Sequence, residues 1–471
     1  MKIIFINPPV KNLITANVPM VVEEGGRGAL PPLGILYVAA YLKKYTSNEI
    51  KILDLELESK SDEEIGDYLL KEKPQVVGIT LISFLLIDVI NLISLIRRFL
   101  PEVKIIAGGP HACIYPVETL NSLHVDYVVL GEGELPCFDL ISNLDDLEKL
   151  KKVRGLVFKD GEEIINTGPR ELIQDLDSLP FPARELTEYK KYYSTLALAN
   201  PTTTMFTSRG CPYQCVFCDR PHLGKFFRAR SAKNVVDEME EVVGLGIKEI
   251  YIYDDTFTID RQRVVDICEE ILRRNLKIYW DVRARVNTVD EELLKLMKKA
   301  GCSRIHYGVE SGVDRVLENL RKGITVEMVR RAFKMTKIVG IETAAYFMVG
   351  CPGETMDDIK KSVELAKELK PAYVHFSVFS IYPATDAYLR ALKAGLVKKD
   401  VWQEFAAAPS ADFKPPLWEE NFSREQLIEI LNQAYRSFYL RPSYVFKKLV
   451  EIKSFSDLWH KARIGLKIFR I

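Results

Sequence analysis

The sequence has few histidines, no net charge and no long uninterrupted apolar run. It holds 6 histidines in 471 residues, and its 65 lysines and arginines balance 65 aspartates and glutamates. Without a surplus of positive charge, no whole-protein field attracts nucleic acid, so we expect no nucleic-acid partner. No secretory leader precedes the first strand-like segment, and no internal repeat is visible.

The most apolar stretch, residues 76–96, carries one charge, Asp88, and is long enough to cross a bilayer. Its β-branched start and the polar residues that interrupt the rest favour a different structure. They predict a buried strand over Val76–Leu81 followed by a helix over Leu85–Leu100. We therefore expect a core segment of a globular protein.

Of the eight cysteines, three stand within eight residues, at Cys211, Cys215 and Cys218. The other five lie among apolar neighbours, and we expect them to be inert core thiols. They are Cys113, Cys137, Cys268, Cys302 and Cys351. Unpaired thiols without an export signal are typical of a reducing cytoplasm.

Two blocks of alternating strands and helices predict an α/β protein. Residues 1–145 read as a doubly wound, Rossmann-like parallel sheet, whose ligands should lie at the carboxyl ends of the strands. Residues 146–200 contain a hairpin signal and an extended linker. Six strand–helix units over 201–400 predict a partial (β/α)6 barrel with its catalytic groups on the loops that follow the strands. Residues 401–471 form a mainly helical C-terminal region.

The cysteine cluster follows the first strand of the predicted barrel with the spacing C-x3-C-x2-C. Thiolates at this spacing on a tight loop can hold an iron–sulfur cluster. Three ligands leave one iron of a four-iron cluster open to a further ligand. The alternatives are a zinc site completed by His222 and three core cysteines that are neighbours by coincidence.

This motif resembles the radical S-adenosylmethionine (SAM) superfamily, whose pattern is C-x3-C-x-aromatic-C, with Phe217 as the aromatic residue. The resemblance implies a 4Fe-4S cluster whose open iron chelates the amino and carboxylate groups of SAM. One electron, from an external donor such as flavodoxin or ferredoxin, then cleaves SAM to methionine and a 5′-deoxyadenosyl radical.

The second and third barrel strands end in residues that the resemblance places near SAM. Asp254 would accept a hydrogen bond from the SAM amino group, and a helix cap at Asp255 or Thr256 is the alternative. Alternation puts Arg283 and Arg285 on one face, where a cation would pair with the SAM carboxylate. A structural salt bridge is the alternative for these arginines.

The fourth and fifth strands end in two further segments that resemble the family. Gly308, Glu310 and Ser311 belong to a G-x-E-S pattern, in which Glu310 would bind the ribose hydroxyls or the SAM amine. A glutamate in so apolar a segment is costly without partners. Gly350 and Gly353 stand in a G-x-P-G-E-T turn whose backbone would contact the adenine.

Three segments at strand ends of the first block are rich in glycine or hydroxyl groups, which admit a cofactor to the backbone. They are Thr80-Leu81-Ile82-Ser83, Gly108-Gly109-Pro110-His111 and Gly131-Glu132-Gly133-Glu134. In this order, upstream of such a barrel, they resemble cobalamin-binding radical SAM enzymes. That group contains the anaerobic magnesium-protoporphyrin oxidative cyclase and many methyltransferases.

One departure concerns the lower face of cobalamin. Other cobalamin proteins use a D-x-H-x-x-G motif, but the loop Asn7-Pro8-Pro9-Val10-Lys11 has no histidine. The resemblance therefore implies cobalamin without a histidine ligand below the cobalt. A degenerate domain that binds no cobalamin is the alternative.

Together these features imply cobalamin-dependent methylation of an unactivated carbon in a small-molecule substrate. The alternatives are oxidative cyclisation, ring rearrangement or carbon–carbon coupling, with or without cobalamin. A non-enzymatic iron–sulfur electron carrier would leave the Glu310 and Gly350 segments unexplained.

The tail from Arg441 to Ile471 holds eight lysines and arginines against two acidic residues, with apolar residues at mostly helical spacing. A basic amphipathic helix suits a lipid interface. We expect either peripheral contact with the inner face of a membrane or delivery of an apolar, lipid-like substrate to the barrel mouth. The alternative is a helix packed on the barrel with a solvated basic face.

Overall fold

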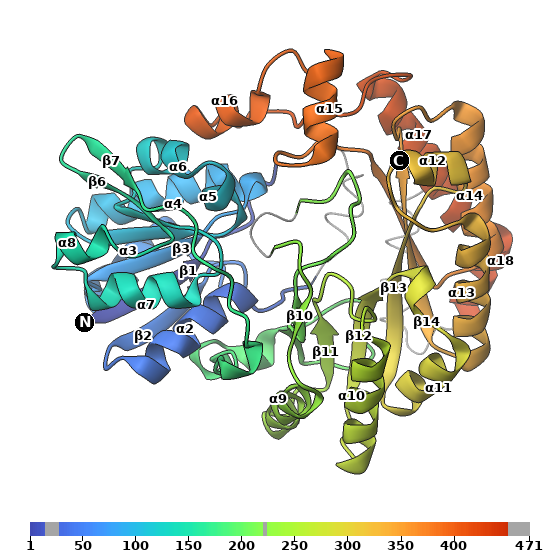
Figure 1. The fold of residues 1–471 in the computed structure, drawn as a ribbon, viewed down its shortest axis with the longest axis horizontal. Coiled ribbons are helices and arrows are strands. Elements are labelled where there is room, and N and C mark those ends of the chain that lie inside the picture. Colours follow the sequence, from blue (N-terminus) through green and yellow to red (C-terminus); the bar gives the residue numbers. More distant parts are fainter. Residues whose placement is uncertain (15–27, 220–223, 451–471) are drawn as a thin grey trace.

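Two sheets lie on opposite sides of the molecule in the computed structural model, which describes residues 1–14, 28–219 and 224–450 (Figure 1). The first sheet has seven strands in the order β2-β1-β3-β4-β5-β6-β7. Its strands are β1 (Lys2–Asn7), β2 (Glu49–Asp54), β3 (Val76–Thr80), β4 (Lys104–Gly108), β5 (Tyr127–Val129), β6 (Leu156–Asp160) and β7 (Glu163–Asn166). The first five are parallel, and the β6–β7 hairpin extends the sheet antiparallel beyond β5.

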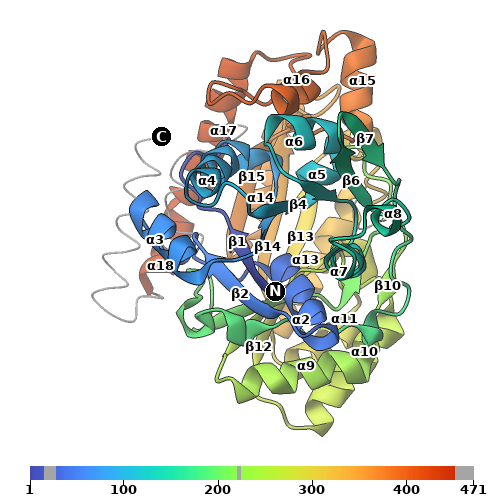
Figure 2. The ribbon, with the colours of Figure 1, turned by 90° about the vertical axis from the view of Figure 1, so that its left-hand side faces the viewer.

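Helices cover both faces of this sheet, as the apolar strands predict. They are α2 (Leu33–Tyr45), α3 (Asp62–Glu72), α4 (Leu86–Phe99), α5 (Pro110–Ile114), α6 (Pro116–Ser122), α7 (Glu134–Ser142) and α8 (Leu147–Leu150). Ile3 and Phe5 of β1 pack in one core with α2 and α7, whereas Ile4 and Ile6 pack in another with α3 and α4. Figure 2 shows α3 and α4 on one side of the sheet and α2 and α7 on the other. The doubly wound fold is therefore confirmed.

The apolar stretch over 76–96 forms β3 and α4, as predicted, and both are buried in the first domain. Within the described ranges, no helix is long and apolar enough to cross a membrane. Asp88, the one charge in the stretch, is buried and accepts hydrogen bonds from the backbone N–H groups of Lys11 and Asn12 at 2.9 and 2.8 Å.

The second sheet has six parallel strands in the order β8-β11-β12-β13-β14-β15, which confirms the partial barrel. They are β8 (Thr202–Met205), β11 (Glu249–Ile252), β12 (Tyr279–Ala284), β13 (Cys302–Glu310), β14 (Glu342–Val349) and β15 (Tyr373–Val378). The helices that connect them are α9 (Ala232–Gly244), α10 (Arg261–Arg273), α11 (Glu291–Lys299), α12 (Asp314–Asn319), α13 (Val326–Val339) and α14 (Met356–Leu369). One short antiparallel pair, β9 (Ser208–Arg209) and β10 (Arg228–Ala229), flanks the cysteine loop.

The C-terminal region is helical, as predicted, with α15 (Asp386–Ala394), α16 (Val401–Ala407), α17 (Arg424–Tyr439) and α18 (Pro442–Val450). Helix α16 reaches back to the first domain, where Ser122 of α6 donates a hydrogen bond to the carbonyl of Ala406 at 2.9 Å. The rest of the basic tail, residues 451–471, lies outside the described residues, so its membrane or substrate role stays a prediction.

Tyrosines of α17 and α18 cover the outer edge of β15. The phenol of Tyr435 lies 3.1 Å from the backbone N of Phe376 and 2.9 Å from its carbonyl O. The phenol of Tyr439 lies 3.0 Å from the backbone N of Val374 and 2.7 Å from its carbonyl O. The phenol of Tyr444 donates to the carbonyl of Ala372 at 3.1 Å. Because an exposed strand edge invites pairing with another chain, these side chains replace the missing neighbour strand.

Candidate active site between the two domains

Asp254, which follows β11, fixes the segment that leads into the cysteine loop. Its carboxylate is fully buried and accepts hydrogen bonds from the N–H groups of Thr207 (2.7 Å) and Ser208 (3.0 Å). The hydroxyls of the same residues donate to it at 2.5 and 2.6 Å. The buried carboxylate thus shapes the strand that leads into Cys211, and the expected bond from the SAM amino group to Asp254 stays a prediction.

The three cysteine thiols stand on one loop beside a buried arginine. Cys215 is buried, whereas Cys211 and Cys218 are half-buried. The guanidinium of Arg285 lies 3.6 Å from the Cys215 sulfur and 3.8 Å from the centre of the Tyr213 ring. The positive charge of Arg285 thus lies beside a sulfur that would carry negative charge as an iron ligand. Donor chemistry and local charge therefore fit a cluster held at three points.

Among the described residues, no three His, Cys, Asp or Glu side chains converge closely enough for one metal ion. The thiolates of a four-iron cluster bind different iron atoms, whereas the ligands of zinc all approach the same ion. His222, the alternative zinc ligand, lies outside the described residues. The other cysteines are buried as expected, except for Cys113, which is half-buried at the edge of the first sheet.

Glu310 has a buried partner, Lys322, that sequence reasoning missed. Their side chains form an ion pair at 2.7 Å, at the bulged end of β13. A Cβ on Gly308 would lie 2.4 Å from the Glu310 oxygen, so only glycine leaves room for this pair. The Lys322 ammonium also lies 5.6 Å from the centre of the Phe217 ring. The backbone carbonyl of Lys322 accepts a hydrogen bond from the Arg285 guanidinium. Lys322 thus links the Glu310 strand end to the cysteine loop.

Ser311 and Gly350, two predicted SAM contacts, have close protein neighbours, and their contact with SAM stays a prediction. The Ser311 hydroxyl is fully buried and lies 3.2 Å from the hydroxyl of Ser362 in α14. Gly350 has φ 77°, and a Cβ there would lie 2.5 Å from Leu427 of α17. The backbone and α17 therefore account for this glycine, without any need for a close ligand.

Arg283 and Arg285 do not share an environment, contrary to the alternation argument. Strand β12 ends at Ala284, and Arg285 turns inward to become buried against the cysteine loop. Arg283 stays exposed inside the barrel, with its guanidinium 4.5 Å from the centre of the Tyr253 ring. The alternation fails because it applies only within the strand.

The first two predicted cobalamin segments meet at the edge of the first sheet. The Leu81 N–H donates to the carbonyl of Gly108 at 2.7 Å, and the His111 N–H donates to Leu81 at 3.2 Å. The Ser83 hydroxyl lies 3.0 Å from Nδ1 of His111. Gly109 has φ 104°, and a Cβ there would lie 2.7 Å from the Leu81 carbonyl. This glycine is required by the neighbouring loop itself.

Two features of this edge fit a polar cofactor. His111 is buried, which lowers its pKa to about 4 and keeps it neutral, and its Nε2 has no hydrogen-bond partner among the described residues. Gly131, with φ 74°, has open space where a Cβ would stand, and its N–H donates to the Cys113 sulfur at 3.1 Å. Beside it, Thr80 is half-buried and Gly133 precedes α7.

Glu132 and Glu134, expected to contact cobalamin, bind arginines beside the cysteine loop, and their cobalamin contact stays a prediction. Arg209 pairs with Glu132 at 2.8 Å and with Glu134 at 2.5 Å, and Arg228 pairs with Glu132 at 3.0 Å. All four side chains are buried, which is tolerable only because each charge has partners. We call these four residues the charge clamp. Because Arg209 stands two residues before Cys211, the clamp joins the Gly131–Glu134 segment to the cysteine loop.

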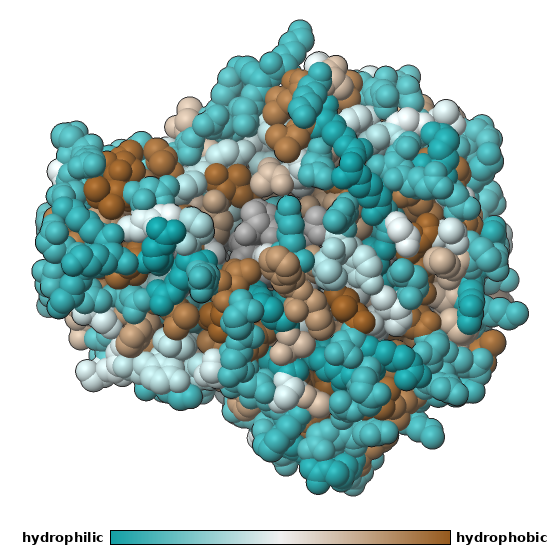
Figure 3. All heavy atoms as spheres, in the orientation of Figure 1, coloured by the Kyte–Doolittle hydropathy of each residue, from teal (hydrophilic) through white to brown (hydrophobic). Residues whose placement is uncertain are grey.

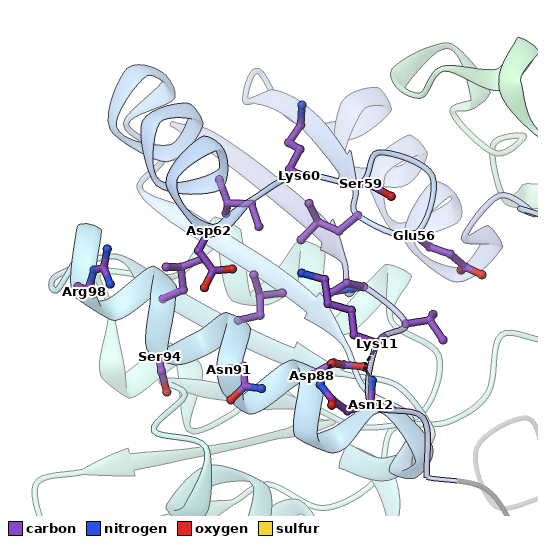
Figure 4. Close-up of a pocket in the computed structure, with 16 residues that line it drawn as sticks. Lys11, Asn12, Glu56, Ser59, Lys60, Asp62, Asp88, Asn91, Ser94 and Arg98 are labelled. Atoms are coloured by element: carbon purple, nitrogen blue, oxygen red, sulfur yellow. Dashed lines mark hydrogen bonds between the residues drawn. The ribbon is translucent and has the colours of Figure 1, made fainter. Parts of the chain in front are cut away.

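A separate cavity of about 580 Å³ opens at the ends of β1 and β2. Figure 4 shows its polar lining: Lys11, Asn12, Glu56, Ser59, Lys60, Asp62, Asp88, Asn91, Ser94 and Arg98. Its lining includes none of the predicted cofactor residues. The face over the junction of the domains appears in Figure 3, where apolar side chains gather among polar ones.

Known proteins share this combination of domains. The chain matches the Radical SAM superfamily over residues 205–366 and the B12 binding domain over residues 26–141. An uncharacterized methyltransferase of Pyrococcus horikoshii is 33% identical over 458 residues, 97% of this chain and 96% of the relative. An anaerobic magnesium-protoporphyrin IX monomethyl ester cyclase of Cereibacter sphaeroides is 28% identical over 88% of this chain and 68% of its own.

The solved structure of OxsB, a cobalamin-dependent SAM radical enzyme with aqua-cobalamin and SAM bound, has the same fold. Its TM-score is 0.77 at 19% identity, over 99% of this chain and 72% of that one. These matches define the class of this protein: enzymes in which a B12-binding domain precedes a radical SAM barrel. The chain belongs to the cobalamin-binding radical SAM family, and its cofactors are a 4Fe-4S cluster, SAM and cobalamin.

Proposed function

We propose that this enzyme methylates an unactivated carbon of a small molecule. The carrying observation is the charge clamp of Glu132, Glu134, Arg209 and Arg228, which ties the B12-binding edge to the cysteine loop. A substrate between these two edges is within reach of both cofactors. The relative named a methyltransferase, which matches nearly the whole chain, supports the same reaction.

Bound to this chain, SAM and its cluster would supply the hydrogen-abstracting radical, and cobalamin would supply the methyl group. Cys211, Cys215 and Cys218 would hold the cluster, and Arg285 would balance thiolate charge beside it. Glu310 has one oxygen held by Lys322, and within the described residues its second oxygen makes no hydrogen bond. That oxygen is suited to accept a bond from the ribose or the amine of SAM.

The reaction is tested with anaerobically reconstituted protein, a reductant, cobalamin and SAM labelled in its methyl group. Because the methyl group on cobalamin must itself come from SAM, each labelled product should accompany one 5′-deoxyadenosine and one S-adenosylhomocysteine. The triple variant of the three cluster cysteines to Ala should lose iron and 5′-deoxyadenosine. Cys268→Ala is the matched control, because its thiol is buried in α10, outside the cysteine loop.

Two results would contradict the proposal. Bound zinc without labile sulfide would exclude the cluster. 5′-Deoxyadenosine formed with a product that carries no label would favour cyclisation or rearrangement, the reaction type named for the Cereibacter sphaeroides relative.

A further inference from the structure

The inside of the barrel carries a layer of polar and aromatic side chains. Within each strand, one set of alternate residues packs outward against the helices: Ile252, Val282, Tyr307, Phe347 and Phe376. Alternation therefore turns their neighbours inward. The inward layer consists of Arg283, His306, Tyr346 and His375, and the register places Arg283 beside His306 and Tyr346 beside His375. Tyr253, which directly follows β11, packs under the Arg283 guanidinium.

Three side chains on adjacent strands, Asp281, His306 and Tyr346, form a hydrogen-bonded chain. His306 Nε2 lies 3.2 Å from the carboxylate of Asp281, and its Nδ1 lies 2.9 Å from the phenol oxygen of Tyr346. Asp281 is buried and also faces Arg304 at 3.8 Å, whereas Tyr346 is 36% exposed. The buried acid and the imidazole thus fix the orientation of a phenol that opens into the barrel.

Arg283 stands beside His306, the histidine that bonds this phenol, and has no charged partner among the described residues. No carboxylate among the described residues lies within ion-pair distance of its guanidinium, which packs over the Tyr253 ring. Burial raises the pKa of Tyr253 to about 12 and also raises the pKa of Tyr346, and the charge of Arg283 opposes both shifts. By geometry the guanidinium lies 4.5 Å from the centre of the Tyr253 ring and on the strand position beside His306, and a guanidinium without a carboxylate partner is suited to bind an oxyanion.

We propose that this wall binds an anionic group of the substrate, a carboxylate or a phosphate, with Arg283 as its ion partner and, when the Nδ1–H of His306 donates to the phenol oxygen, Tyr346 as a neighbouring donor. The inference rests on the proposed function, because it concerns the substrate of that reaction. A wholly apolar substrate would desolvate Arg283 without compensation. The SAM carboxylate is not the expected anion, because it would bind the open iron of the cluster that Cys211, Cys215 and Cys218 would hold.

The first test identifies the chemical class of the product. A small-molecule extract of the producing cells is separated into anionic, neutral and organic-soluble fractions, and each is incubated with the reconstituted enzyme and methyl-labelled SAM. Label should enter the anionic fraction, and phosphatase treatment of the product distinguishes a phosphate ester from a carboxylate. Label confined to the neutral or organic-soluble fraction would overturn the inference while leaving the methyltransferase proposal intact. No label and no 5′-deoxyadenosine in any fraction would refute both.

The second test uses variants with the active fraction as substrate. Arg283→Gln should raise the substrate KM about 10- to 100-fold, as expected for loss of a charge-assisted bond, and Arg283→Lys should recover part of it. Tyr346→Phe, which removes one oxygen, should raise the KM by less. Arg330→Gln, on the outer surface of α13 where it pairs with Glu368, is the control. If Arg283→Gln raises the KM for SAM instead, the arginine belongs to the SAM site and the inference is wrong.

Discussion

The charge clamp between the domains yields a prediction whose magnitude follows from burial. Glu132→Gln removes one negative charge that pairs with Arg209 and Arg228 and accepts a hydrogen bond from the backbone N–H of Ile173 at 2.7 Å. The substitution leaves two buried arginines facing one carboxylate, Glu134, and breaking a buried ion pair typically costs about 3–5 kcal/mol of unfolding free energy. Because the clamp fixes the strand before Cys211, retention of iron and cobalamin should fall as well.

Urea unfolding, followed by circular dichroism, measures this cost. The matched control is Glu240→Gln, because Glu240 pairs with Arg274 at the same 2.8 Å but its side chain is 59% exposed. Such a pair contributes about 0–1 kcal/mol. Adding Arg209→Met to Glu132→Gln restores charge balance, so the double variant should lose less than the sum of the single losses. Equal costs for Glu132→Gln and Glu240→Gln would show that the clamp charges are effectively solvated.

The same carboxylate gives the clamp a pH dependence. Burial acts to raise the pKa of Glu132, but Arg209 and Arg228 outweigh it and hold that pKa below its ordinary value. Its stabilising contribution is therefore complete above the unfolded pKa, about 4.3, and is lost as pH falls through the folded value. The difference in unfolding free energy between wild type and Glu132→Gln should shrink on acidification below pH of about 4.

Three further changes test other parts of the structure. Tyr439→Phe removes two hydrogen bonds to the edge of β15 and should cost about 1–3 kcal/mol in urea unfolding, whereas the exposed Tyr45→Phe should cost little. Gly308→Ala should raise the KM for SAM about tenfold or more by displacing the Glu310–Lys322 pair, whereas Gly244→Ala, which meets open space, should not. Burial raises the pKa of Glu354 to about 7, so the folded state binds its proton more tightly. As the pH rises from about 4.5 to 7, the unfolding free energy of the wild type should therefore fall, and that of Glu354→Gln should fall less.

The sequence by itself determined the elements and the cofactor motif. Strand and helix patterns are local, because burial on both faces makes strands continuously apolar and burial on one face makes helices periodic. The six strand–helix units predicted over 201–400 therefore correspond to β8 and β11–β15 with the helices that connect them. The cysteine motif is also local, since its ligands share one loop.

Only the tertiary structure decided which polar groups meet. Asp254 was expected near SAM and Glu132 near cobalamin, and the structure gives them protein partners that the sequence did not predict: Ser208 and Arg209, 46 and 77 residues away along the chain. No local pattern identifies such partners, because a carboxylate in a glycine-rich loop suits a ligand and an arginine equally well. Which one it meets depends on chain segments that the fold brings together, since a buried charge is stable only where that packing supplies a partner.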